Sequence, residues 1–92
     1  MLEIAYSKSY RKNLKKRLKS GNFNKDKLAK VISTIINGKT LEIKHRDHEL
    51  TGIFQGTREC HIEPDLLLIY EIDNKNNRLN LVNIGNHSEF FD

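Results

Sequence analysis

The chain has 92 residues, of which 37% are hydrophobic and 30% charged, and its net charge is +4. This length fits one domain, residues 1–92, and excludes a second domain. No apolar run approaches the ~20 residues of a membrane-spanning helix, and the start, "MLEIAYSKSY", lacks the long apolar stretch of a signal peptide. A single cysteine, Cys60, excludes an internal disulfide framework, so we expect a cytoplasmic protein that does not engage a membrane.

The first part of the chain predicts one strand followed by two helices. Residues 1–6 alternate apolar and polar side chains, as a half-buried strand does. Ser7 or Ser9 can cap a helix in which apolar residues recur every four positions and which Gly21 ends. Asn24 can cap a second helix, whose apolar residues lie at helical spacing before an Asn-Gly pair: Leu28, Val31, Ile32, Ile35 and Ile36.

The second part predicts strands joined by short turns. Residues 39–49 show no clear period, and "LTGIFQG" indicates a weak strand interrupted by glycines. "TRECHI" alternates, so Cys60 and Ile62 face one way and Glu59 and His61 the other. "LLLIYEI" is apolar on both faces, as in a central strand, and "RLNLVNI" is a last strand. We therefore expect an α+β fold, with the two N-terminal helices packed on one face of a mainly antiparallel sheet of four to five strands and the other face partly open.

Charge is distributed very unevenly along the chain. Residues 1–46 carry 13 Lys/Arg and 3 Asp/Glu, a net charge of +10, whereas residues 47–92 carry 3 and 9, a net charge of −6. The cations concentrate in "KSYRKNLKKRLK", the first predicted helix. Such a concentration is typical of a surface that binds nucleic acid, but it also fits a solvated helix face or a surface that binds an acidic protein.

Four histidines come from separate regions that a compact sheet could bring together. His45 and His48 precede the later strands, His61 lies on the open face of one strand, and His87 follows the last strand. They form either a shared site or four unrelated surface residues. A zinc site from these histidines and Cys60 is disfavoured, because Cys60 and His61 point to opposite faces and no HExxH or paired CxxC is present. No metal and no cofactor are therefore expected.

Cleavage of RNA without a metal is the alternative chemistry. RNA carries its own nucleophile, the 2′-hydroxyl, so a protein has to remove that proton, neutralise the phosphate and protonate the leaving 5′-oxygen. Histidine, with an ordinary pKa of about 6.5, can do the first or the last task near neutral pH. Arg58 could hold the phosphate, although alternation places it on the helix side, and a terminal phenylalanine could stack on an unpaired base.

The residues of the C-terminal half carry a family resemblance. "DHELTGIFQGTRECHIEPDLLLIYEI" followed by "GNHSEFF" resembles the YafQ branch of the RelE-like toxins of bacterial type II toxin–antitoxin systems. The shared pattern is DH-x-L-x-G, then R-[DE]-x-H-x-x-PD, a hydrophobic strand that ends in Tyr, and G-x-H-x-x-x-F. In the N-terminal half only the order of elements matches. Glu59 stands where the pattern usually has Asp, and Leu66 where an aromatic residue can follow Pro-Asp. These two departures bear on the substrate preference that the resemblance implies more than on the chemistry.

The resemblance implies a RelE-like fold and an endoribonuclease that cuts messenger RNA, commonly on the ribosome. It implies a cytoplasmic mRNA interferase silenced by a cognate acidic antitoxin, with which it forms a hetero-oligomer that binds operator DNA. The implied catalytic residues are His48, His61, Asp65 and His87, with His87 as the general acid and the base left open among the other three. The implied RNA contacts are Arg58, Glu59, Phe91, Lys12, Lys15 and Lys16. The alternative is a module of the same fold that binds RNA, or acts in a repressor complex, without cleaving.

Overall fold

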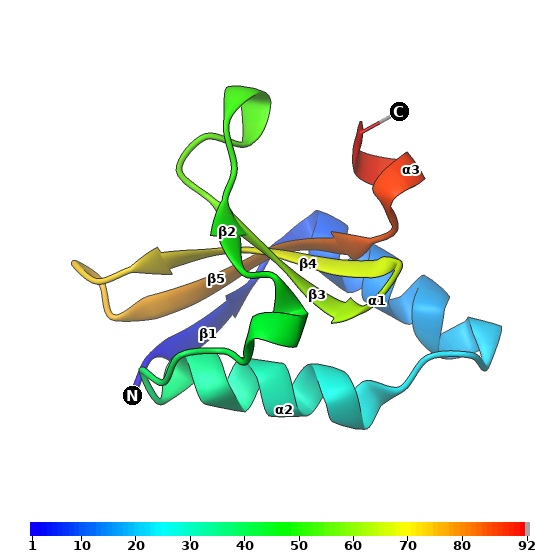
Figure 1. Ribbon diagram of the computed structural model, residues 1–92, viewed down its shortest axis with the longest axis horizontal. Coiled ribbons are helices and arrows are strands. Elements are labelled where there is room, and N and C mark those ends of the chain that lie inside the picture. The colour runs from blue at the N-terminus through cyan, green and yellow to red at the C-terminus, as the bar shows by residue number, and fades with distance from the viewer. Residues whose placement is uncertain (92) are drawn as a thin grey trace.

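The computed structural model describes residues 1–91 and consists of a five-stranded sheet with helices (Figure 1). In chain order the elements are β1 (Glu3–Tyr6), α1 (Lys8–Ser20), α2 (Lys25–Ile36), η1 (Ile43–His45), β2 (His48–Glu49), η2 (Gly52–Phe54), β3 (Arg58–Glu63), β4 (Leu66–Asp73), β5 (Arg78–Gly85) and α3 (His87–Phe91). The prediction of an α+β fold is confirmed. No helix within residues 1–91 is long and apolar enough to cross a membrane.

The two long helices begin and end at the residues that the sequence indicated. The Ser7 hydroxyl accepts a hydrogen bond from the backbone N–H of Tyr10, and α1 ends at Gly21, whose φ of 77° is left-handed. The Asn24 side chain accepts bonds from the first backbone N–H groups of α2. Both helices contribute to a single hydrophobic cluster together with β3, β4 and β5: Tyr10, Leu28, Val31, Ile35, Cys60, Ile62, Leu66, Leu68, Tyr70, Leu79, Leu81 and Ile84.

The strand order is β1-β5-β4-β3-β2, which makes β4 the middle strand. Strand β1 runs parallel to β5, and the other three pairings are antiparallel, so the sheet is mixed. Strand β4 is buried on both faces, as its continuous apolar sequence predicted. Leu67 and Ile69 are completely buried, yet they lie outside the helix-side cluster. Their neighbours in register on β3 are His61 and Glu59, so these four side chains share the second face.

One local prediction was wrong, and two short elements were not predicted. The stretch "LTGIFQG" contains the 3₁₀ helix η2 in place of a strand, because Gly52 and Gly56 adopt left-handed φ values of 69° and 94°. The aperiodic stretch before it contains β2, a strand of only two residues. The chain end forms the short helix α3, which stands on the opposite side of the sheet from α2 (Figure 1). The second face is therefore more closed than the sequence indicated.

Candidate active site

A buried carboxylate lies on the second face, on the strand next to the edge of the sheet. Glu59 on β3 is only 4% exposed. Its Oε1 lies 3.4 Å from Nε2 of His61, two residues further along the same strand, and 3.8 Å from Nε2 of His48. Alternation brings His61 to the same face as Glu59, and the β2–β3 register places His48 directly opposite Glu59. The sequence named Glu59 as an RNA contact, whereas the structure places it between two of the predicted catalytic histidines.

The sheet register then brings His87 to this cluster. Gly85, at the end of β5, pairs with Leu67 on β4, and Leu67 pairs with His61 on β3. The chain turns into α3 two residues later, and the His87 ring centroid lies 5.5 Å from that of His61. One potential ligand atom from each of Glu59, His61 and His87 lies within 4.8 Å of the other two. Two residues of β3 and the first residue of α3 thus form one compact polar cluster.

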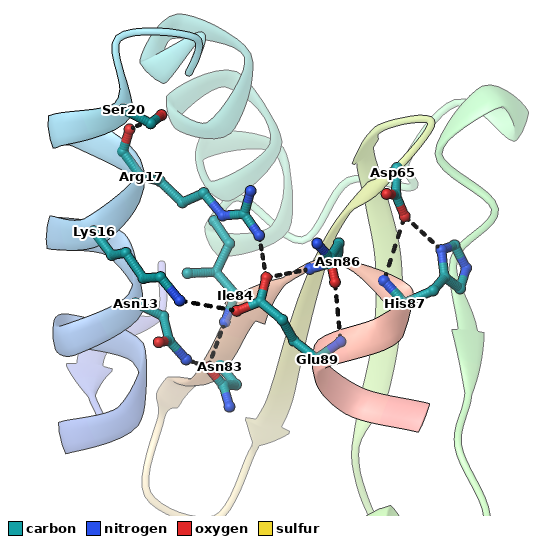
Figure 2. Close-up of polar contacts among 10 residues, drawn as sticks. All are labelled: Asn13, Lys16, Arg17, Ser20, Asp65, Asn83, Ile84, Asn86, His87 and Glu89. Atoms are coloured by element: carbon teal, nitrogen blue, oxygen red, sulfur yellow. Dashed lines mark hydrogen bonds and ion pairs between the residues drawn. The ribbon is translucent and has the colours of Figure 1, made fainter. Parts of the chain in front are cut away.

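Asp65 holds His87 in place from the β3–β4 turn. The Nδ1 of His87 lies 2.9 Å from Oδ1 of Asp65, and the backbone N–H of His87 donates to the same oxygen at 3.3 Å (Figure 2). These hydrogen bonds hold the pKa of the Asp65 carboxyl below its usual value. An ionised carboxylate can only accept, so Nδ1 of His87 carries the hydrogen, and Nε2 is left available to exchange a proton with a substrate.

Two further histidine contacts support the strand edge. The Nδ1–H of His45 donates to the backbone carbonyl of His61 at 2.7 Å, beyond the point where β2 stops pairing with β3. The Nδ1–H of His48 donates to the backbone carbonyl of Arg46 at 2.7 Å. His45, at the end of η1, therefore contacts the backbone of β3. Of the predicted catalytic residues, His48 and His61 lie beside Glu59, and Asp65 bonds to His87.

Arg58 lies apart from the histidine cluster. Its guanidinium donates to Asp47 at 3.0 Å and to Glu49 at 3.5 Å, and the buried hydroxyl of Tyr70 donates to the same Asp47 carboxylate. The bond to Asp47 raises the pKa of Arg58 above its usual value. Alternation predicted this helix-side position. An Arg58 contact with RNA stays a prediction, and it requires the guanidinium to exchange Asp47 for a phosphate.

The other predicted RNA contacts are accessible. Lys12, Lys15 and Lys16 are exposed on α1, and Nζ of Lys16 lies 3.9 Å from Oε2 of Glu89. Phe91 is 48% exposed, and its ring lies 6.0 Å from that of Phe54 and 6.4 Å from that of His87. An aromatic surface thus stands beside the histidine that the sequence assigned as general acid.

Sequence reasoning missed the residues that hold α3 to the body of the protein. Glu89 accepts a hydrogen bond from the backbone N–H of Asn86 at 3.0 Å, and the Asn86 side chain accepts one from the backbone N–H of Glu89 at 2.9 Å. This reciprocal arrangement is a capping box. The spacing Asn-x-x-Glu in "GNHSEFF" was the available signal for a helix that begins at His87.

Among residues 1–91, the group of side chains placed so that it could hold a metal ion consists of Glu59, His61 and His87. One carboxylate and two imidazoles suit zinc, copper or iron. This set differs from the one considered from the sequence. Cys60 lies in the helix-side core, where burial raises the pKa of its thiol to about 12, so the thiolate that binds metals is disfavoured.

The fold and the cluster define a small α+β protein whose histidines and carboxylates are arranged for acid–base chemistry. Known proteins are similar to this chain in sequence and in fold. Residues 2–92 match the family described as "Bacterial toxin of type II toxin-antitoxin system, YafQ". The "mRNA interferase toxin YafQ" of Escherichia coli (strain K12) is 36% identical over 93 residues, which cover 97% of this chain and 95% of that protein.

Solved structures of toxins are also similar to this chain in sequence and fold. The metal-bound toxin from Helicobacter pylori is 43% identical with a TM-score of 0.91, and the match covers 99% of this chain and 100% of that chain. YafQ in the E. coli DinJ–YafQ complex is 29% identical with a TM-score of 0.88, and the match covers both chains completely. The chain therefore belongs to the YafQ family of toxins of bacterial type II toxin–antitoxin systems. The resemblance inferred from the sequence, and with it the expected class of mRNA interferase, is confirmed at the level of the family.

Proposed function

We propose that this protein is a metal-independent endoribonuclease that cleaves messenger RNA in the cytoplasm, either on the ribosome or free. The observation that carries the proposal is the cluster of Glu59, His61 and His87, in which His87 is oriented by Asp65. The proposal also assigns a RelE-like fold, in which the two N-terminal helices cover one face of a mainly antiparallel sheet and leave the other for catalysis. The relative's name, mRNA interferase, supports the substrate class.

The reaction uses the 2′-hydroxyl of RNA as nucleophile. A base removes the 2′-hydroxyl proton, the 2′-oxygen forms a bond to phosphorus, and the bond from phosphorus to the 5′-oxygen breaks. Nε2 of His87 gives its proton to the departing 5′-oxygen, so the products carry a 2′,3′-cyclic phosphate and a 5′-hydroxyl. Asp65 keeps the His87 ring in the required tautomer, with Nδ1–H toward the carboxylate.

His61 is the proposed base. It is the nearest described histidine to His87, and a base and an acid have to reach the same phosphate from two sides. The adjacent Glu59 carboxylate stabilises the imidazolium that forms when His61 takes the proton. His48 lies on the other side of Glu59, so His48→Ala and His61→Ala compared in one assay distinguish the two candidate bases.

An acidic antitoxin is the proposed protein partner. The E. coli structure is a complex of YafQ with DinJ, and the net charge of +10 on residues 1–46 complements an acidic chain. We propose that the antitoxin covers this basic surface and that the resulting hetero-oligomer binds operator DNA. Co-expression of a cognate antitoxin should abolish growth arrest by this chain. A chain that arrests no growth when expressed alone would support the alternative, a module that does not cleave.

Metal binding is a second candidate, supported by the donor set and by the metal-bound Helicobacter pylori neighbour. Glu59, His61 and His87 would hold the ion. Because a bound ion occupies the nitrogen lone pairs that acid–base catalysis needs, the ion would inhibit cleavage. The sequence predicted that no metal is bound. Metal binding at concentrations met in the cell would contradict that prediction.

Product analysis tests the proposed reaction. A synthetic RNA incubated with the purified toxin should yield a 2′,3′-cyclic phosphate and a 5′-hydroxyl end. The same RNA with one 2′-deoxy sugar at the cleaved position should resist, because the nucleophile is missing there. EDTA should leave the rate unchanged. Cleavage of the 2′-deoxy RNA, or 5′-phosphate products, would contradict the mechanism.

A further inference from the structure

The helix that carries His87 is too short to be stable by itself. Helix α3 has five residues, and isolated helices shorter than about 12–15 residues are marginal in water. Its position therefore depends on contacts with the rest of the protein. Phe90 supplies one of them, since a Cβ on Gly85 would lie 3.0 Å from its ring. Gly85 thus permits the close approach of α3 to the end of β5.

Glu89 supplies the polar contacts. Its Oε1 accepts the backbone N–H of Asn86 and forms an ion pair with the guanidinium of Arg17 on α1, and its Oε2 lies 3.9 Å from Nζ of Lys16 (Figure 2). The side chains of Arg17 and Glu89 are only 27% and 26% exposed. One carboxylate thus closes the capping box of α3 and ties that helix to α1, 72 residues away in sequence.

Helix α1 is itself fixed against the same end of β5. The Asn13 side chain donates to Oδ1 of Asn83 at 2.7 Å, and that oxygen also accepts the backbone N–H of Ile84 at 2.9 Å (Figure 2). Asn13 and Arg17 are four residues apart, so they lie on one face of α1. The anchored helix therefore presents Arg17 at a fixed place beside α3.

We propose that Arg17 and Glu89 are positioning residues for the reaction, which together hold α3 so that His87 stays within reach of Asp65 and His61. This inference rests on the proposed role of His87 in RNA cleavage. It assigns to the basic helix α1 a task besides binding polyanions: one of its cations orients the catalytic end of the chain. A misplacement of about 1 Å at a catalytic group can reduce a rate by about a hundredfold.

The experiment is a double-variant cycle with two readouts. Glu89→Gln keeps an oxygen for the N–H of Asn86 but removes the ion pair, and Arg17→Met removes the partner. Each single variant should lower the single-turnover cleavage rate by roughly 10- to 100-fold. The double variant should fall no further than the worse single variant, because the same contact is lost in both. Lys19→Met is the matched control: it removes a charge from the same turn of α1 without removing an ion pair described within residues 1–91, and it should keep the wild-type rate.

The second readout is the imidazole ¹⁵N NMR spectrum of His87, which needs no cleavage and reports which ring nitrogen carries the hydrogen. Asp65 accepts a hydrogen bond from Nδ1–H in the wild type, so release of α3 in Glu89→Gln should let the ring populate the other tautomer as well. Thermal stability should change little, since partly exposed ion pairs contribute little to it. If the wild type does not cleave RNA, the proposed function fails, while the ¹⁵N spectrum still tests the positioning.

Four results would overturn the proposal. One is an imidazole ¹⁵N spectrum of His87 that is the same in Glu89→Gln as in the wild type. The two single effects could multiply in the double variant. Lys19→Met could slow cleavage as much as Arg17→Met. The loss of rate could also follow only the fraction of unfolded protein at the assay temperature.

Discussion

Asp65 receives two hydrogen bonds from a single residue, His87, one from the backbone N–H and one from the imidazole Nδ1. Both reach the same carboxylate oxygen across 22 positions of sequence. The turn between β3 and β4 is thereby connected to the first residue of α3. Because the carboxylate is an obligatory acceptor, it determines both the orientation and the tautomer of the ring.

The first prediction concerns stability at acid pH. The pKa of Asp65 is lower in the folded protein than in the unfolded chain, so the unfolded state binds more protons, and stability rises with pH in this range. The contribution is complete above the unfolded value of about 3.9 and is lost as the pH falls through the folded pKa. Asp65→Asn should therefore show a smaller fall of the melting temperature between pH 5 and pH 2 than the wild type. Equal slopes for both proteins would show that the His87 contact is absent in solution.

A second prediction tests His87 as the general acid. His87→Ala should reduce the single-turnover cleavage rate by roughly 10²–10⁴, the usual contribution of one acid–base group. RNA affinity should change little, since the transferred proton matters only in the transition state. The measurement is a rate and a binding titration on the same RNA. Equal losses of rate and affinity would make His87 a binding residue and move the search for the acid to His61 or His48.

A third prediction concerns the basic surface of α1. Charge reversal of Lys12 and Lys15 should weaken RNA binding and reduce its salt dependence, by about 0.7 in the log–log slope for each phosphate contact that is lost. Lys16 needs a separate variant, because its ammonium also lies near Glu89. Charge reversal at Lys16 is expected to lower the cleavage rate as well as the affinity. An unchanged salt slope in the Lys12/Lys15 variant would show that this surface serves the antitoxin and not RNA.

A fourth prediction concerns metal ions. Added zinc or copper should slow cleavage, and EDTA should restore the rate, because the ion would occupy nitrogens that have to exchange protons. Replacement of Glu59 by Gln should weaken the inhibition, since Glu59 supplies the anionic ligand. Calorimetric titration of metal into both proteins gives the matching affinities. Loss of activity in EDTA alone would instead make the ion a cofactor.

How far the sequence predicted this molecule depended on the length of each pattern. Helices α1 and α2 have caps and several apolar residues at helical spacing, so they were found, as were the three long strands. Strand β2 has two residues and α3 has five, and neither is long enough to show a period. The histidines were identified by residue type and family pattern.

The environment of the site, in contrast, depends on tertiary contacts. Glu59 was expected on a partly open face and is almost completely buried, with the side chains of three histidines gathered around its carboxylate: His48, His61 and His87. Alternation gives the direction of a side chain but not what covers it. The ion pair of Arg17 with Glu89 joins residues 72 positions apart, and no local pattern could indicate it.

The last prediction distinguishes the two phenylalanines at the chain end. Phe90 is half-buried and lies against Gly85, whereas Phe91 is exposed beside His87 and Phe54. Phe91→Ala should weaken RNA binding by about 1–3 kcal/mol if the ring stacks on a base, with the melting temperature unchanged. Phe90→Ala, the matched control, should lower the cleavage rate by loosening α3 and should leave the intrinsic affinity for a short RNA nearly intact. Fluorescence titration with one short RNA, thermal unfolding and single-turnover cleavage on both variants separate the two roles. If Phe91→Ala lowers the melting temperature and spares binding, its ring packs against Phe54 and does not contact RNA.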